Sequence, residues 1–217
     1  MPSSISPKLL RGGLLSIDAG NGNVRRVVAL QYNPDSISRS MQIQGTGDNG
    51  ERSEVLRLKG PAVETIKLEA EIDATDHLEH PAQNAITAKF GIAPQLAALE
   101  GMINPSAADL VSADSLAKIG TIEIAAAQAP LTVFVWSAQR VLPVRLTEFS
   151  ITEEAFDPDL NPIRAKVSLG MRVLSVNDVG FSHKAGTLFL AYLQNREKLA
   201  GTFPGAKYDV LGLGGKP

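Results

Sequence analysis

The sequence contains no cysteine among its 217 residues. A disulfide scaffold, a thiolate metal site and a cysteine nucleophile are therefore excluded. Aromatic residues make up only 5% of the chain, with a single tryptophan, which disfavours an aromatic platform for sugars or single-stranded nucleic acid. No segment approaches the roughly 20 continuous apolar residues of a membrane-spanning helix, so direct membrane insertion is not expected.

The chain also lacks an excess of positive charge, because 21 basic residues face 23 acidic ones and the net charge is -2. Nucleic-acid binding usually requires a basic surface, so no nucleic-acid partner is expected. Residues 1–8 contain no apolar stretch of the kind that secretory signals need, which predicts synthesis and assembly in the cytoplasm. The hydrophobic share of 44% predicts a globular chain with a substantial core.

What the sequence does contain is a strong pattern of β-strands, two of which alternate with unusual regularity. From Pro61 to Asp73 apolar and polar side chains alternate over on the order of 40 Å. The second strand runs from Ile163 to Val173, directly after the turn 157–162 that two prolines bracket. Ordinary strands have about five or six residues. The two long strands predict a tall sheet with one wet face.

Together with shorter elements, these strands predict one mainly β domain at residues 1–201. A glycine- and proline-rich tail follows at 202–217. A helical insertion is expected at about 76–118, because alanine and leucine rise there, and the best helix is Thr187–Ala200, with Gly201 as its C-cap. Residues 106–118 suit either a helix or a loop. The remaining expected elements are strands at 9–17, 24–32, 36–44, 120–126, 131–137 and 141–152, a loop at 44–52, and helices at 81–90 and 94–103.

Catalytic chemistry has weak candidates only. His77 and His80, with His183 as a third ligand, suggest a metal-dependent hydrolase, but their spacing lacks the i, i+4 pairing of a helical zinc site. The carboxylates at 153–154 and at 157 and 159 suggest a glycosidase pair, but carboxylates beside prolines more often form turns. We therefore expect no enzyme activity, no metal site and no cofactor.

The charged faces of the two long strands are the remaining candidate site. They are either ordinary solvated surfaces or the lining of a channel or subunit interface, where complementary charge sets the register. If the two faces are adjacent, their opposite charges pair across strands or across subunits. The residues on these faces are Thr65, Lys67, Glu69, Glu71, Arg164, Lys166, Ser168 and Arg172.

One segment carries a family resemblance. Residues 156–165, FDPDLNPIRA, resemble the FDPDGxPxRA region that precedes an alternating strand in the tube-like N-terminal domain of contractile injection system and phage-tail baseplate proteins. The segment QYNPDSIS at 31–38 is similar to the family's aromatic-Asn-Pro turn, and 187–200 is similar to its closing helix. The resemblance covers roughly Leu9 to Gly201, in the same order.

The resemblance implies a tail-tube-like β-barrel or sandwich that oligomerises as a hexameric ring around a central channel. It implies an inner baseplate adaptor that joins the inner tube protein to the baseplate hub or spike and meets sheath-proximal baseplate proteins. The particle is either released or retained by the cell. The family has no catalytic residues to carry over to this sequence.

Two departures from the family are visible. Only seventeen residues follow Ala200, too few for the LysM peptidoglycan-binding module of the best-known members, so cell-wall binding is not expected. Leu160 stands where glycine is more usual, which suggests a different turn geometry. Three alternatives stay open: a tube subunit, tube terminator or cap adaptor of the same particle; the metal-dependent hydrolase; and a monomeric binding module.

Overall fold

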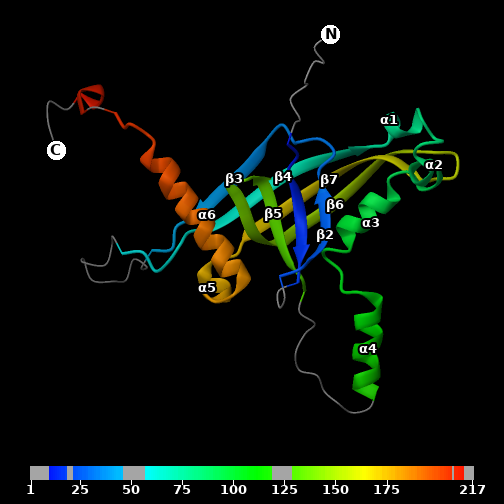
Figure 1. Cartoon of the computed structure of the whole chain (residues 1–217), viewed down its shortest axis with the longest axis horizontal. Helices are drawn as coiled ribbons and strands as arrows, with labels where there is room; N and C mark the ends of the chain where they lie inside the picture. Colours follow the sequence, from blue (N-terminus) through cyan, green and yellow to red (C-terminus); the bar gives the residue numbers. More distant parts are fainter. Residues whose placement is uncertain (1–9, 19–21, 46–56, 119–128, 207, 213–217) are drawn as a thin grey trace, which may run out of the picture.

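Seven antiparallel strands form one sheet in the computed structural model, which describes residues 10–18, 22–45, 57–118, 129–206 and 208–212. Across the sheet the order is β2-β1-β5-β6-β7-β4-β3 (Figure 1). The prediction of a mainly β chain is confirmed, and the strand expected at 120–126 lies outside the described residues. The strands are β1 Gly13–Ile17, β2 Val24–Ala29, β3 Ile37–Gln42, β4 Val63–Asp73, β5 Leu131–Ser137, β6 Arg140–Phe156 and β7 Pro162–Val173.

The sheet curls until its two ends approach each other. Gln31, which follows β2, bonds the last residue of β4: its Nε2 donates to the Asp73 carbonyl oxygen at 2.6 Å, and its Oε1 accepts from the Asp73 backbone N–H at 2.9 Å. The end strands β2 and β3 do not pair with each other in the described part of the chain. The described strands thus form a curled, open sheet, and backbone pairing among them does not close a barrel within one chain.

A helical insertion follows β4 and precedes β5, as predicted. Its helices are α1 Thr75–Leu78, α2 Ala85–Phe90, α3 Ala93–Glu100 and α4 Ala107–Lys118. Pro94 lies in the first turn of α3, where its missing N–H costs nothing. Pro81 does not start a helix as expected, because a turn occupies the residues before α2. Residues 107–118, left open between helix and loop, form α4, which extends away from the sheet (Figure 1).

The last long helix begins earlier and ends later than its sequence predicts. Lys184–Gly201 forms α6, and a short helix that the sequence did not reveal, α5 Val176–Val179, precedes it. The Nδ1 atom of His183 caps α6 by accepting from the Ala185 N–H at 3.1 Å. Thr202 rather than Gly201 is the C-cap, and the 3₁₀ helix η2, Tyr208–Leu211, lies within the tail expected to be extended. None of the described helices has the length and apolar character needed to cross a membrane.

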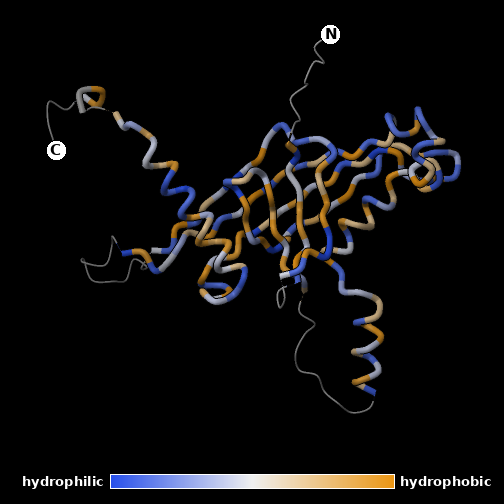
Figure 2. Tube along the Cα trace, viewed as in Figure 1, coloured by the Kyte–Doolittle hydropathy of each residue, from blue (hydrophilic) through white to orange (hydrophobic). Residues whose placement is uncertain are grey.

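The hydrophobic core lies inside the curl of the sheet, because alternating residues of the long strands point to that side. Ile66, Val167 and Met171 are completely buried there, and side chains of α3 and α6 pack against them. Figure 2 shows apolar and polar positions alternating along the long strands. Fully burying one aliphatic side chain contributes about 1.5–3 kcal/mol. The alternation read from the sequence therefore selects the core face correctly.

One carboxylate interrupts this core face and joins α6 to the sheet. Glu64 of β4 is 4% exposed. The Arg39 guanidinium donates to its Oε1 at 2.7 Å, and the Tyr192 hydroxyl lies 3.2 Å from its Oε2. Arg196 of α6 approaches the same carboxylate at 3.7 Å. Burial, followed by the nearby Glu64 charge, raises the pKa of Tyr192, so its hydroxyl remains a donor to the carboxylate.

Candidate functional site: a polar sheet face between two unpaired edges

Four strands carry a continuous polar surface on the side of the sheet that faces away from the core. We call this surface the polar face. Since antiparallel partners share a face, the registers of β3, β4, β7 and β6 define its rows. It comprises Ser38, Ser40, Thr65, Lys67, Glu69, Glu71, Asp73, Arg145, Glu148, Ser150, Thr152, Glu154, Arg164, Lys166, Ser168 and Arg172.

All eight candidate residues from the sequence lie on the polar face. Thr65 lies opposite Arg172, Glu69 opposite Ser168, and Glu71 opposite Lys166 in the pairing of β4 with β7. Lys67 and Arg164 lie opposite Gly170 and Asp73. The two charged strand faces are therefore adjacent, as the pairing hypothesis required. The structure describes a single chain, so their role in a channel or an interface remains a proposal.

The charges of the polar face pair within the chain. Arg164 Nε donates to Asp73 Oδ2 at 2.7 Å and lies 3.8 Å from Glu71 Oε1. The Lys166 ammonium lies 3.0 Å from Glu154 Oε1. Exposed pairs of this kind contribute only ~0–1 kcal/mol each, so they do not hold the fold together. Their consequence is a face on which basic and acidic side chains occur in equal number and cancel.

One ion pair that the sequence analysis did not predict crosses β7. The Lys67 ammonium on β4 donates to both oxygens of Glu148 on β6, at 2.9 and 2.8 Å. Gly170 is the residue of β7 between them. A Cβ at Gly170 would lie 2.8 Å from the Glu148 Cβ, closer than real carbon contacts allow. The glycine therefore leaves room for Glu148 to lie across β7 and reach Lys67.

Asp73 is the most strongly held carboxylate of the polar face. It accepts from the Thr75 backbone N–H at 2.7 Å, from the Thr75 hydroxyl, and from Arg164. Burial raises the pKa of Asp73, but the bonds from Thr75 and Arg164 together outweigh that effect and lower the pKa below 3.8. On Lys166, the bond to Glu154 and its negative charge raise the pKa. Both residues are charged near neutral pH.

The polar face lies between two unpaired strand edges. Within the described residues, β5 covers β6 only as far as Val144, and residues 145–156 pair with β7 alone. On the far side, β3 pairs only with β4. The free part of β6 spans on the order of 40 Å, and backbone N–H and C=O groups alternate along it. Natural proteins normally shorten, charge or cover such edges, because they are templates for pairing with another chain.

The edge formed by β2, at the other end of the sheet, is better protected. β2 and β3 each have six residues, but β2 carries two adjacent arginines, Arg25 and Arg26, whereas β3 carries one. Arg25 pairs with Asp18, and the Arg26 guanidinium donates to the Ala98 carbonyl oxygen at 2.9 Å. An edge that carries several charged side chains resists association. The edges of β3 and of β6 are therefore the stronger candidates for contact with another chain.

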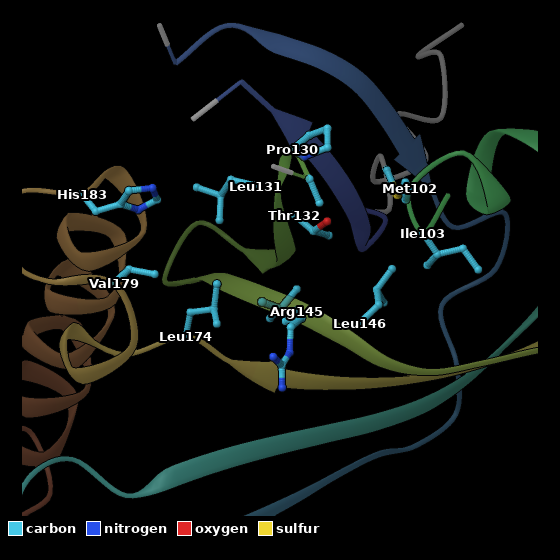
Figure 3. Close-up of a pocket in the computed structure, with 12 residues that line it drawn as sticks. Met102, Ile103, Pro130, Leu131, Thr132, Arg145, Leu146, Leu174, Val179 and His183 are labelled. Carbon is cyan, nitrogen blue, oxygen red and sulfur yellow. The ribbon is translucent and has the colours of Figure 1, made fainter. Parts of the chain in front are cut away.

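The histidines proposed as metal ligands do not come together. His77 lies in α1 and His80 in the turn after it, at one end of the molecule, whereas His183 caps α6 at the other end (Figure 1). Figure 3 shows His183 at a cavity with Leu131, Leu174 and Val179, and the residues lining that cavity include no second histidine and no carboxylate. Within the described ranges no group of three His, Cys, Asp or Glu side chains can hold a metal.

Two of the four carboxylates considered for a glycosidase pair, Asp157 and Glu154, have structural roles. Asp157 Oδ1 accepts from the backbone N–H groups of Asp159 and Asn161, both at 2.8 Å. The hydrogen bond from the Asn161 side chain is the largest effect that lowers the pKa of Asp157. Glu154 pairs with Lys166. The interpretation of 157–162 as a structural turn fits these bonds.

Comparisons with known proteins add little to this picture. No protein-family model matches the chain, and no curated protein matches it. A solved chain from the tail of an empty GTA particle with C6 symmetry is similar at 10% identity, over 75% of this chain and 90% of that one, with a TM-score of 0.30. A score this low does not indicate a shared fold, and no argument about the present chain rests on it.

Proposed function

We propose that this chain is a structural, non-enzymatic ring subunit of a contractile phage-tail-like particle. One observation carries the proposal: a polar, charge-balanced sheet face lies between two edges that are unpaired in the described part of the chain, β3 on one side and residues 145–156 of β6 on the other. These edges belong to different strands, so contact between them joins copies head to tail. A head-to-tail contact closes into a ring when the rotation between copies divides a full turn.

In this arrangement β3 of one copy pairs with β6 of the next, and the sheet continues from subunit to subunit. The polar face then lines a channel, while α3, α6 and the hydrophobic core lie on the outside. Because its charges cancel within each chain, neighbouring copies do not repel each other across the channel. The eight residues predicted from the sequence are channel-lining residues under this proposal, with Thr65 and Arg172 in the row that includes Ser40 of β3.

The resemblance of residues 156–165 to tube-like baseplate domains supports a more specific role. The ring is the inner baseplate adaptor, a hexamer that connects the inner tube to the hub or spike and contacts sheath-proximal baseplate proteins. Its work is mechanical, since a ring of continuous sheet transmits the force of a contracting sheath without a catalytic group. A tube subunit, a tube terminator and a cap adaptor are built on the same contact and differ in copy number.

The experiment is a mass measurement on the purified chain by native mass spectrometry, with electron microscopy of the same sample. The proposal predicts a closed oligomer with a central hole, and the mass gives the number of subunits. Copy number per particle then separates an adaptor, present as one ring, from a tube subunit, present in many. A chain that stays monomeric at high concentration favours the alternative of a monomeric binding module and refutes the ring.

A further inference from the structure

The turn between β6 and β7 is a rigid, buttressed projection. Within it the Asp157 backbone N–H donates to the Asn161 carbonyl oxygen at 2.9 Å, and the Leu160 N–H donates to the Asp157 carbonyl oxygen at 3.0 Å. The Asn161 side chain donates to the Lys89 carbonyl oxygen of α2 at 3.2 Å. Figure 1 shows this turn beside α1 and α2, at the end of the molecule opposite α6. The turn holds one shape without a partner.

Leu160 is the unusual residue of this turn. Its φ is 66°, a left-handed conformation that no other described residue except glycines adopts. Bulky side chains rarely adopt it, whereas glycine does so freely. Leu160 is also 79% exposed, and Phe156 on the same turn is 50% exposed. A strained backbone that presents a large apolar side chain to solvent is typical of a functional site.

A basic pocket lies at the opposite end of the same strand. A cavity of about 460 Å³ is lined by Arg39, Arg140 and Arg196 together with Trp136, Tyr192 and Leu199. We call it the arginine pocket. Arg39 and Arg196 share the single carboxylate of Glu64. The Arg140 side chain has no ion-pair or hydrogen-bond partner among the described residues, whereas its backbone pairs with Ser137. The pocket therefore has uncompensated positive charge beside apolar and aromatic surface.

The turn and the pocket are complementary. Asp159 on the turn and Glu153 near the end of β6 have side chains without an ion pair in the described part of the chain, so this end of the hairpin offers free negative charge beside Phe156 and Leu160. Arg140 is the first residue of β6 and Phe156 the last, which separates them by on the order of 50 Å. A chain cannot bring its own turn to its own pocket. Contact between the two requires a second copy.

We propose that the β6–β7 turn of one copy docks into the arginine pocket of another copy. Leu160 and Phe156 pack against Trp136 and Leu199, and Asp159 pairs with Arg140. The contact rests on the proposed function, because it presumes that copies assemble, but it is separate from the pairing of strand edges. The contact joins one end of a subunit to the opposite end of another subunit. It therefore connects one ring to the next or stabilises neighbouring subunits within a ring.

The sharpest test is Leu160→Gly, because the two consequences of this variant have opposite signs. Glycine relieves the left-handed backbone and raises the temperature of unfolding of the subunit, while it removes an apolar contact and weakens association by about tenfold. Leu10→Gly is the matched control, since Leu10 is 78% exposed and lies outside the turn. Association is measured by sedimentation over a concentration series. Unchanged association of the Leu160→Gly variant overturns the proposal.

A charge exchange tests the pocket. Arg140→Glu or Asp159→Arg alone is expected to weaken association, and the double variant is expected to restore it, because the ion pair re-forms with its charges reversed. If the double variant associates as weakly as the single variants, the assignment of the pocket is overturned. The same holds if Arg140→Glu associates normally while Leu160→Gly associates weakly. Rings that persist in every variant refute the docking but leave the ring proposal standing, whereas a monomeric unmodified chain refutes the ring itself.

Discussion

The buried carboxylate of Glu64 provides the firmest prediction about the fold. Replacing it with glutamine keeps its shape but removes the charge that Arg39 and Arg196 share. Breaking a buried ion pair from one side costs about 3–5 kcal/mol. The side chains of Arg39 and Arg196 are 26% and 42% exposed, so water compensates part of the loss. We expect Glu64→Gln to lower the free energy of unfolding by about 2–3 kcal/mol.

Thermal unfolding followed by circular dichroism measures this loss. For a chain of this size, 1 kcal/mol lowers Tm by about 2–4 °C, so a fall of roughly 5–10 °C is expected. Glu69→Gln is the matched control, because Glu69 is an exposed carboxylate of the same strand and its loss is expected to change stability by less than about 0.5 kcal/mol. Equal effects of the two variants, or a change below about 0.5 kcal/mol for Glu64→Gln, would refute the account of this cluster.

Three further variants test the polar face. Gly170→Ala forces Glu148 aside and is expected to cost about 1 kcal/mol in urea unfolding. The added cost should vanish in a Glu148→Gly background, which removes the Cβ that the new methyl group meets, and a cost that persists there contradicts the explanation. The lowered pKa of Asp73 stabilises the fold above about pH 3.8, and this stability is lost as pH falls through the folded pKa, so Asp73→Asn should flatten the stability profile between about pH 5 and 2. Arg164→Glu places a third carboxylate beside Asp73 and Glu71. It should impair ring assembly, which electron microscopy measures, while circular dichroism shows a folded subunit. Normal rings would count against the proposal.

The sequence reveals the parts of this surface that depend on local pattern. β4 and β7 alternate without interruption, so their polar residues, from Thr65 to Arg172, could be assigned to one face. The polar residues of β6 could not be assigned to one face in the same way, because its register shifts near Thr147 and Glu154, where extra residues break the period of two. Glu148 was therefore missed, although it completes the pair with Lys67.

Other features depend on contacts between distant segments and leave no local signal. The free edge of β6 exists because β5 ends early relative to it. Likewise, Arg39, Arg140 and Arg196 belong to β3, β6 and α6, and only the fold brings them to one pocket. Leu160 is intermediate: its departure from the expected glycine is visible in the sequence, but its left-handed backbone and exposure are not.

The pairing of the β3 edge with the β6 edge is the central claim, and the absence of cysteine makes it directly measurable. Ser40 on β3 and Ser150 on β6 both lie on the polar face, with β4 and β7 between them. Three strand spacings alone put them at least roughly 14 Å apart within one chain, and their rows also differ along the strands. That separation exceeds the reach of a disulfide.

A Ser40→Cys, Ser150→Cys variant can therefore form disulfides only between copies, and shifted pairs such as Ser40 with Thr152 or Ser38 with Ser150 test other registers. Under oxidising conditions a ladder of covalent multimers on a non-reducing gel, ending at the subunit number of the ring, is the predicted result. Each single-cysteine variant should give no more than dimers. Intact rings in which none of the double variants cross-links would contradict the account.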